Sequence, residues 1–292
     1  MLVWLNGRLV EAKRARVPAL DRGLLHGDGL YETWRTYGGE PFAVAAHLRR
    51  LAAAARRLAL PVPGDAEVWV RRSRLLVRRN RLPDAAVRLT ITRGDSGEAI
   101  VPERRAPPTV LLLVRPLPAD LAHRQRDGVR VVLLPFPRDA SATWGGLKLL
   151  GHASAVAGRM LAMRRRADEG LYVTPAGDVT EGTTSNVFAV FGRTLVTPPL
   201  DAGILAGVTR AMVLALARRG GLRVREAPLA AARLARADEI FLTASTVEIL
   251  PVVRLDGRRV GDGRPGPVTR ALQARYAAAV ARAQNANRRR IA

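Results

Sequence analysis

The sequence predicts an α/β fold with mixed sheets, divided between two domains. Short runs of alternating apolar and polar residues, typical of strands, are interspersed with stretches in which apolar residues recur at helical spacing. A polar stretch with two prolines, PLPADLAHRQRDG near 116–128, separates the halves. We therefore expect a smaller N-terminal domain at 1–118, a linker at 119–127 and a larger C-terminal domain at 128–292.

The first half opens with a predicted hairpin over MLVWLNGRLV, in which Asn6 and Gly7 form a favoured two-residue turn. A glycine-bounded strand follows in LLHGDGLYETWRTYGGEPF. Amphipathic patterns predict helices at 45–59 and 65–80. AAVRLTITRG and TVLLLVRPL are the next predicted strands.

The second half begins with the apolar strand VRVVLLPF and continues with a predicted helix at about 150–167. GLYVTPAGDVTEGTTSNVFAVFGRTLVTPP suits several strands joined by tight glycine turns. VTRAMVLALARRGG is a predicted helix closed by glycine, and EIFLTASTVEILPVVRLDGRRV supplies two more strands.

The composition restricts the class of protein. The formal net charge is +23, but the arginines are spread along the polar faces of predicted helices and aromatic residues make up only 4%, so we expect no specific nucleic-acid partner. Cysteine is absent, which excludes disulfides and thiolate sites, and we predict no metal site. We see neither a signal peptide nor an apolar run of membrane length, and therefore expect a cytoplasmic protein without a membrane partner.

Lysine occurs only at Lys13 and Lys148, against 48 − 2 = 46 arginines. Unlike arginine, a lysine amine can form a Schiff base and carry a proton. Lys148 lies in the apolar stretch GLKLL, where desolvation can lower the pKa of the amine and make it a nucleophile, whereas Lys13 lies in the polar run EAKRAR. Alternatively, Lys148 survived by chance and its side chain simply reaches the surface.

Three further features accompany this lysine. Glu181 follows a predicted strand, and Val208 and Thr209 open a predicted helix whose free N–H groups suit a phosphate. Thr243, Ser245 and Thr246 cluster at a strand end, although such hydroxyls also satisfy backbone groups. An amine, an acid and phosphate-binding termini together are what pyridoxal phosphate requires.

The chain resembles the class IV pyridoxal-phosphate enzymes over residues 1 to about 280. The motifs that carry the resemblance, in family order, are DRGLLHGDGLYE (21–32), HLRRL (47–51), Lys148, VTEGTTSNVF (179–188), GILAGVTR (203–210), ADEIF (237–241) and EILPV (248–252). That family contains branched-chain aminotransferases, D-amino acid aminotransferases, (R)-selective amine transaminases and aminodeoxychorismate lyases. The resemblance implies the two-domain type IV fold of the D-amino acid aminotransferase kind, with pyridoxal 5'-phosphate between the domains of a homodimer.

Carried over motif by motif, the resemblance implies a role for individual residues. Lys148 would form the Schiff base, or aldimine, and shuttle the proton, and Glu181 would pair with the pyridine nitrogen. The expected phosphate ligands are Arg50, the amides of Val208 and Thr209, and the loop residues Ser245 and Thr246. Tyr31 would face the substrate, and Arg35 and Arg88 stand where branched-chain enzymes place arginines near substrate carboxylates; a role as surface charges stays open for both.

The chain departs from each subfamily. Branched-chain enzymes carry Asn-Tyr four and five residues after the lysine, where this chain has His152 and Ala153. D-Amino acid aminotransferases place an Arg-x-His carboxylate trap where this chain has Glu98 and Ile100, and the NRLE of the lyases is replaced by GHASA. The prediction is therefore a transaminase acting between an amino acid or amine and a 2-oxo acid. The alternatives are a 4-amino-4-deoxychorismate lyase and an arginine-rich binding protein that keeps the scaffold.

Overall fold

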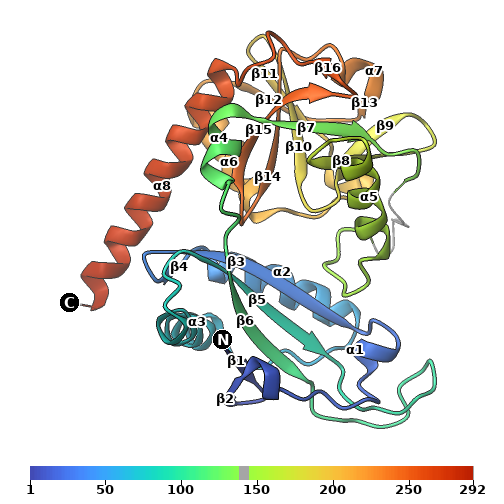
Figure 1. Ribbon diagram of the computed structural model, residues 1–292, viewed down its shortest axis with the longest axis vertical. Helices are drawn as coiled ribbons and strands as arrows, with labels where there is room; N and C mark the ends of the chain where they lie inside the picture. The colour runs from blue at the N-terminus through green and yellow to red at the C-terminus, as the bar shows by residue number, and fades with distance from the viewer. Residues whose placement is uncertain (138–144, 292) are drawn as a thin grey trace. The chain divides into compact units, whose positions relative to one another are not determined.

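The computed structural model describes residues 1–137 and 145–291, with side chains through residue 286. The chain forms two compact units, each drawn in Figure 1. The first comprises Met1–Leu117, Leu147–Gly151 and the chain end from Ala286, and the second comprises Pro118–Gly146 and His152–Asn285.

The first unit is built on a six-stranded sheet with the strand order β2-β1-β6-β5-β3-β4. Its elements are β1 (Leu2–Leu5), β2 (Arg8–Glu11), the 3-10 helix η1 (Ala12–Arg14), α1 (Arg22–Leu25), β3 (Gly29–Tyr37), β4 (Glu40–Pro41), α2 (Val44–Arg57), α3 (Ala66–Asn80), β5 (Ala85–Thr92) and β6 (Val110–Pro116). The predicted N-terminal hairpin is confirmed: Asn6 and Gly7 have φ of 46° and 93° and join β1 to β2. The two predicted helices correspond to α2 and α3.

The core of the first unit lies between this sheet and the two helices. Alternate residues of a strand face opposite sides, so Leu30 and Trp34 of β3 and Leu89 of β5 point together toward α2 and α3. All three side chains are fully buried. Tyr31 and Arg88 project from the other face of the same strands.

The second unit is built on a ten-stranded sheet ordered β12-β11-β10-β14-β15-β7-β8-β9-β13, with β16 paired to β15. A further pairing between β9 and β10 makes the run β10-β14-β15-β7-β8-β9 return to its start, so these strands form a closed ring. The strands are β7 (Val129–Leu133), β8 (Glu169–Val173), β9 (Asp178–Gly182), β10 (Asn186–Phe191), β11 (Thr194–Thr197), β12 (Arg223–Glu226), β13 (Leu229–Ala230), β14 (Glu239–Ala244), β15 (Glu248–Leu255) and β16 (Arg258–Arg259).

Helical segments complete the second unit. They are α4 (Leu121–Asp127), α5 (Ala153–Arg164), the 3-10 helix η2 (Leu200–Ala202), α6 (Val208–Arg219), α7 (Ala231–Leu234) and α8 (Pro267–Ile291), of which the last turns fall in the first unit. None of the helices in the described ranges is both long enough and apolar enough to cross a membrane.

Two segments differ from the predicted domain limits. Residues 121–127, which the prolines suggested as part of a linker, form α4, because Leu121 is buried and Gln125 donates to the Val247 carbonyl at 2.9 Å. Leu147–Gly151, expected in the C-terminal domain together with Lys148, groups with the first unit. Its backbone pairs with β3, a long-range contact that sequence spacing does not reveal.

Leu89 tests how much the first core contributes to stability. We expect Leu89→Ala to lower the free energy of unfolding by about 2–5 kcal/mol, because it removes a fully buried side chain and leaves a cavity. Leu24→Ala is the matched control, since that side chain is 71% exposed and its loss should change stability by about 0.5 kcal/mol or less. Urea unfolding of both variants measures the difference; equal stabilities would contradict the assigned core.

Candidate active site

The residues predicted to form the site belong to both units. Tyr31, Arg35, Arg50, Arg88 and Lys148 lie in the first unit, and Glu181, Val208, Thr209, Ser245 and Thr246 lie in the second.

Main-chain hydrogen bonds to the start of β3 position Lys148. The Tyr31 N–H donates to the Lys148 carbonyl at 3.0 Å, and the Leu150 N–H donates to the Gly29 carbonyl at 3.3 Å. Gly29 must be glycine here, because a Cβ atom would lie 2.5 Å from the Ile91 carbonyl and 2.7 Å from Leu150 Cδ1. The lysine therefore emerges from a segment held against a strand rather than from a free loop.

The Lys148 amine contacts Tyr31. Its Nζ donates to the tyrosine hydroxyl at 3.1 Å and lies 4.3 Å from the centre of the ring. The Arg88 guanidinium lies over the same ring, with Cζ at 3.7 Å from the centre. The pKa of Arg88 is lowered, mainly by burial. The nearby Tyr31 hydroxyl acts to raise this pKa, and the positive charge of Arg115 acts to lower it. Arg88 nevertheless stays charged at any working pH.

Arg35 shares the sheet face that carries Tyr31. It lies four residues further along β3, and its guanidinium carbon is 4.5 Å from the centre of the Tyr37 ring. The structure thus brings Tyr31 and Arg88 to Lys148, and it sets Arg35 further along the same strand.

Arg50 belongs to a buried cluster on the helix side of β3. Glu32, fully buried, accepts hydrogen bonds from Arg50 Nε at 2.7 Å and from Arg50 Nη2 at 2.7 Å. His47 Nδ1 lies 2.8 Å from the same carboxylate. Arg50, predicted as a phosphate ligand, is therefore fixed by a bidentate ion pair, the geometry that most restricts a guanidinium.

Burial and the contacts within the cluster shift the pKa values of Glu32 and His47. Burial acts to raise the pKa of Glu32, but hydrogen bonds and charge from Arg50 and His47 outweigh it and lower this pKa from 4.5 to about 2. Burial lowers the pKa of His47, and the positive charges of Arg50 and Lys148 act in the same direction, against the raising effect of Glu32. Glu32 is therefore a carboxylate near neutral pH.

Glu181 occupies the ring closure of the second unit. It lies on β9 opposite Asn186 of β10, and its buried carboxylate accepts from Asn186 Nδ2 at 3.3 Å and from the Leu205 N–H at 3.0 Å. Two donors on one oxygen fix the orientation of the carboxyl group. A carboxylate held in this way can accept a hydrogen bond from a protonated ring nitrogen.

Val208 and Thr209 open α6, and the N-cap residue before them, Gly207, has no side chain to cap the first N–H groups. A Cβ atom at this position would lie 2.1 Å from Asn186 Oδ1, so any other residue would displace the Asn186 side chain. The helix N-terminus therefore lies directly beside the side chain that holds Glu181, and its N–H groups suit an anion.

Ser245 and Thr246 lie in the tight turn between β14 and β15, where Ala244 pairs with Glu248. Just before the turn, Thr243 of β14 pairs with Asn186 of β10. Its hydroxyl oxygen is buried and has no hydrogen-bond partner among the described residues. An orphaned buried hydroxyl next to Asn186 and this turn is consistent with a bound polar group.

Sequence reasoning had missed Glu32, His47 and Asn186 as members of these clusters. For the first two a signal existed. Glu32 alternates with apolar Leu30 and Trp34 in a predicted strand, which marks it as a buried acid in need of cations, and HLRRL offers a histidine and an arginine one helical turn apart. Asn186 gave no comparable signal, because its role depends on the closure of the strand ring.

Comparison with known proteins assigns the family. Residues 29–255 match the profile of amino-transferase class IV. The chain belongs to the class IV aminotransferase family. It is 34% identical over 277 residues to a putative branched-chain-amino-acid aminotransferase of Methanocaldococcus jannaschii, an alignment that covers 94% of this chain and 95% of the relative.

Two further relatives extend the comparison. An aminodeoxychorismate lyase of Bacillus subtilis is 33% identical over 281 residues, covering 94% of this chain and 93% of the lyase. The solved structure of a T.th. branched-chain amino acid aminotransferase with pyridoxamine 5'-phosphate has a TM-score of 0.88 and 28% identity, covering 96% of this chain and 93% of that one.

These findings confirm the predicted family and the type IV fold. They also support the prediction of an aminotransferase, an enzyme of a family that depends on pyridoxal phosphate. The roles of the individual site residues stay predictions.

The buried Glu32 cluster should make stability dependent on pH. A carboxyl whose pKa falls from 4.5 to about 2 on folding stabilises the folded state above pH 4.5 and loses that contribution as the pH falls toward 2. The lowered pKa of His47 acts in the same direction, because below its ordinary value of 6.5 the unfolded chain takes up the proton more readily.

Glu32→Gln tests this. At neutral pH it should cost about 3–5 kcal/mol, because it leaves Arg50 without its buried partner, and it should flatten the loss of stability on acidification. Glu40→Gln is the control, since Glu40 also pairs with an arginine, Arg74, but near the surface, and should cost about 1 kcal/mol or less. Urea unfolding from neutral pH down to about pH 3 measures both; an equal cost would contradict the role of burial.

Proposed function

We propose that this protein is a pyridoxal-phosphate-dependent transaminase that moves an amino group between an α-amino acid and a 2-oxo acid. The observation that carries the proposal is Lys148, the only lysine besides Lys13, whose amine contacts the hydroxyl of Tyr31. It is supported by the family membership of the chain and by the pyridoxamine 5'-phosphate that is bound in a structural relative.

The donor set of the chain fits this cofactor. An amine is present to hold an aldehyde, a buried carboxylate to face a ring nitrogen, and arginine and helix N–H groups to face a phosphate. The unpartnered Thr243 hydroxyl supports the same assignment, since it leaves a buried polar atom for a ligand. We assign Arg50, Lys148, Glu181, Val208, Thr209, Ser245 and Thr246 to cofactor binding.

Pyridoxal phosphate, when bound, supplies an electron-accepting ring that weakens the bonds to the substrate's α-carbon. Lys148 would hold the cofactor covalently between turnovers and, once displaced by the incoming amine, would act as the general base at the α-carbon. The Tyr31 hydroxyl, 3.1 Å from Nζ, is placed to orient that amine. The Arg88 guanidinium lies over the ring of the same tyrosine, 3.7 Å from its centre.

Glu181 would keep a ring nitrogen protonated. Its carboxylate is held by Asn186 and by the Leu205 N–H, so it would accept the ring N–H without reorganising. Arg50, oriented by Glu32, and the first N–H groups of α6 would take the phosphate.

Arg88 would select substrates that carry a carboxylate. Its guanidinium lies against Tyr31, the residue that the amine of Lys148 contacts, and is therefore placed to bind a carboxylate near the reacting carbon. We assign Tyr31, Arg35 and Arg88 to substrate binding. The homodimer and the cytoplasmic location stay predictions.

The second candidate function is the 4-amino-4-deoxychorismate lyase activity of one relative. The same lysine would serve it, but its product, pyruvate, would form without an amino acceptor.

Lys148→Ala should abolish transamination and the yellow colour of the purified protein, because it removes the amine that would bind the cofactor covalently. After borohydride reduction, mass spectrometry should find the cofactor fixed to the peptide that contains Lys148 in the wild type only. Lys13→Ala is the matched control, since Lys13 is the other lysine of the chain, and it should keep both colour and activity. A fully active Lys148→Ala enzyme would end the proposal.

A half-reaction screen tests the substrate class. L-leucine, L-glutamate, D-alanine and (R)-1-phenylethylamine are mixed separately with the enzyme, and the loss of the yellow band is followed. We expect at least one of the three amino acids to react and the amine, which lacks a carboxylate, to react poorly. Arg88→Leu should lower kcat/KM for the best amino acid by at least about 10-fold, because it removes one charge-assisted hydrogen bond to the substrate carboxylate.

The same enzyme is then given aminodeoxychorismate without an oxo acid. No pyruvate should appear; its rapid release would favour the lyase instead. A preference for (R)-1-phenylethylamine over every amino acid would contradict the carboxylate role of Arg88.

A further inference from the structure

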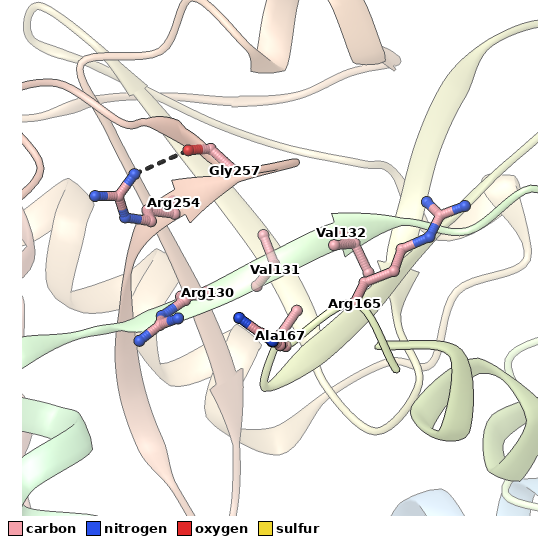
Figure 2. A pocket seen from close by; sticks show the side chains of 8 residues that line it. Arg130, Val131, Val132, Arg165, Ala167, Arg254 and Gly257 are labelled. Atoms are coloured by element: carbon pink, nitrogen blue, oxygen red, sulfur yellow. Dashed lines mark hydrogen bonds between the residues drawn. The ribbon is translucent and has the colours of Figure 1, made fainter. Parts of the chain in front are cut away.

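A cavity of about 390 Å³ lies in the second unit, and none of its lining residues is assigned to the cofactor or substrate. Figure 2 shows its lining. Four of its eight lining residues are arginines, Arg130, Arg165, Arg166 and Arg254, and none is acidic. The other lining residues include the buried Val131 and Val132 of β7.

The sheet itself brings two of these arginines together. Arg130 of β7 and Arg254 of β15 are neighbours in the parallel register of the two strands. The register shifts by one residue between Val252 and Arg254, and without this bulge Val253 would stand beside Arg130 instead. Like charges side by side on adjacent strands destabilise a sheet. Arg254 also stands opposite Arg259 of β16, but only its pair with Arg130 borders the cavity.

The other two arginines directly follow helix α5, which ends at Arg164. The negative end of a helix dipole attracts cations, and this accounts for Arg165 and Arg166 without a ligand. It does not account for Arg130 and Arg254, which lie on strands. The helix end and the two strands border the same cavity, so four arginines from three separate elements line one space.

No carboxylate among the described residues lies within ion-pair distance of the four guanidinium groups. None of the four guanidinium groups forms an ion pair with a described residue, and Arg254 Nη1 donates only to the Gly257 carbonyl, at 2.9 Å. Two acids lie close by. Asp256, next to the lining residue Gly257, accepts the Leu133 N–H through Oδ1 at 3.0 Å. The other is Asp168. Its Oδ2 accepts the Arg130 backbone N–H at 2.9 Å, and its Oδ1 lies 3.8 Å from Arg124 Nη1.

We propose that this cavity binds a small polyanion that carries phosphate or carboxylate groups. Guanidinium groups bind both kinds of oxyanion in bidentate fashion. The volume lies at the lower end of that of small-molecule sites, about 300–1,000 Å³, and therefore suits a compact metabolite rather than a polymer. The proposal is independent of the transaminase assignment, because the cavity lies wholly in the second unit and shares no residue with the assigned site.

The test is isothermal titration calorimetry at constant ionic strength, on protein saturated with pyridoxal phosphate so that its cofactor phosphate ligands are occupied. The probes are inorganic pyrophosphate and citrate, a phosphate and a carboxylate polyanion. Arg130→Ala/Arg254→Ala should weaken the better probe at least 10-fold. Arg223→Ala/Arg225→Ala is the matched control: it also removes two exposed arginines from one strand of the same sheet, β12, and should bind as the wild type does.

Arg165→Ala/Arg166→Ala leaves both strands intact and should show the same loss, so the proposal stays testable if the strand variant does not fold. Equal affinities in all four proteins, an equal loss in the control, or no binding of either probe would each overturn it. A short DNA duplex that displaces the probe from the wild type would also overturn it, in favour of a nucleic-acid surface.

Discussion

The pairing of the Lys148 segment with the start of β3 is the constraint on which the rest of the first unit's chemistry depends. Two main-chain hydrogen bonds and the absence of a side chain at Gly29 fix the position of the lysine backbone. These main-chain bonds hold the amine beside Tyr31 even though the segment is remote in sequence from β3. The only freedom left to the amine is that of its own side chain.

Because successive side chains of a strand point to opposite faces of the sheet, β3 contributes residues to both faces. Tyr31 projects to the face of Arg88, and the next residue, Glu32, projects into the core against α2. The buried acid would be unfavourable alone, but its bonds to Arg50 and His47 overcome its desolvation and lower its pKa. A single strand thus carries, on one face, an aromatic ring in contact with two basic side chains and, on the other, a paired carboxylate.

The sequence predicted the secondary structure correctly in segments where a local pattern decides it, such as α2, α3 and the first hairpin. Helical spacing predicted α2 and α3 to within about two residues, and Asn6-Gly7 predicted the first hairpin. Long-range backbone pairing could not be predicted in this way. Examples are the grouping of Lys148 with the first unit, the contact of Glu181 with Asn186 at the ring closure, and the bulge that sets Arg254 beside Arg130. Each depends on register between distant strands, which no local spacing encodes.

The excess of arginine makes carboxylates the scarce partners in this protein, with 25 acidic residues against 48 basic ones. Individual acids therefore serve two cations. Asp28 pairs with Arg22 and Arg93, and Glu226 pairs with Arg210 and Arg218. Removing one such acid leaves two positive groups without their partner, so the loss in free energy of unfolding exceeds that from breaking a single ion pair. In a chain of this charge, a cavity whose lining holds four arginines and no acid attracts solute anions.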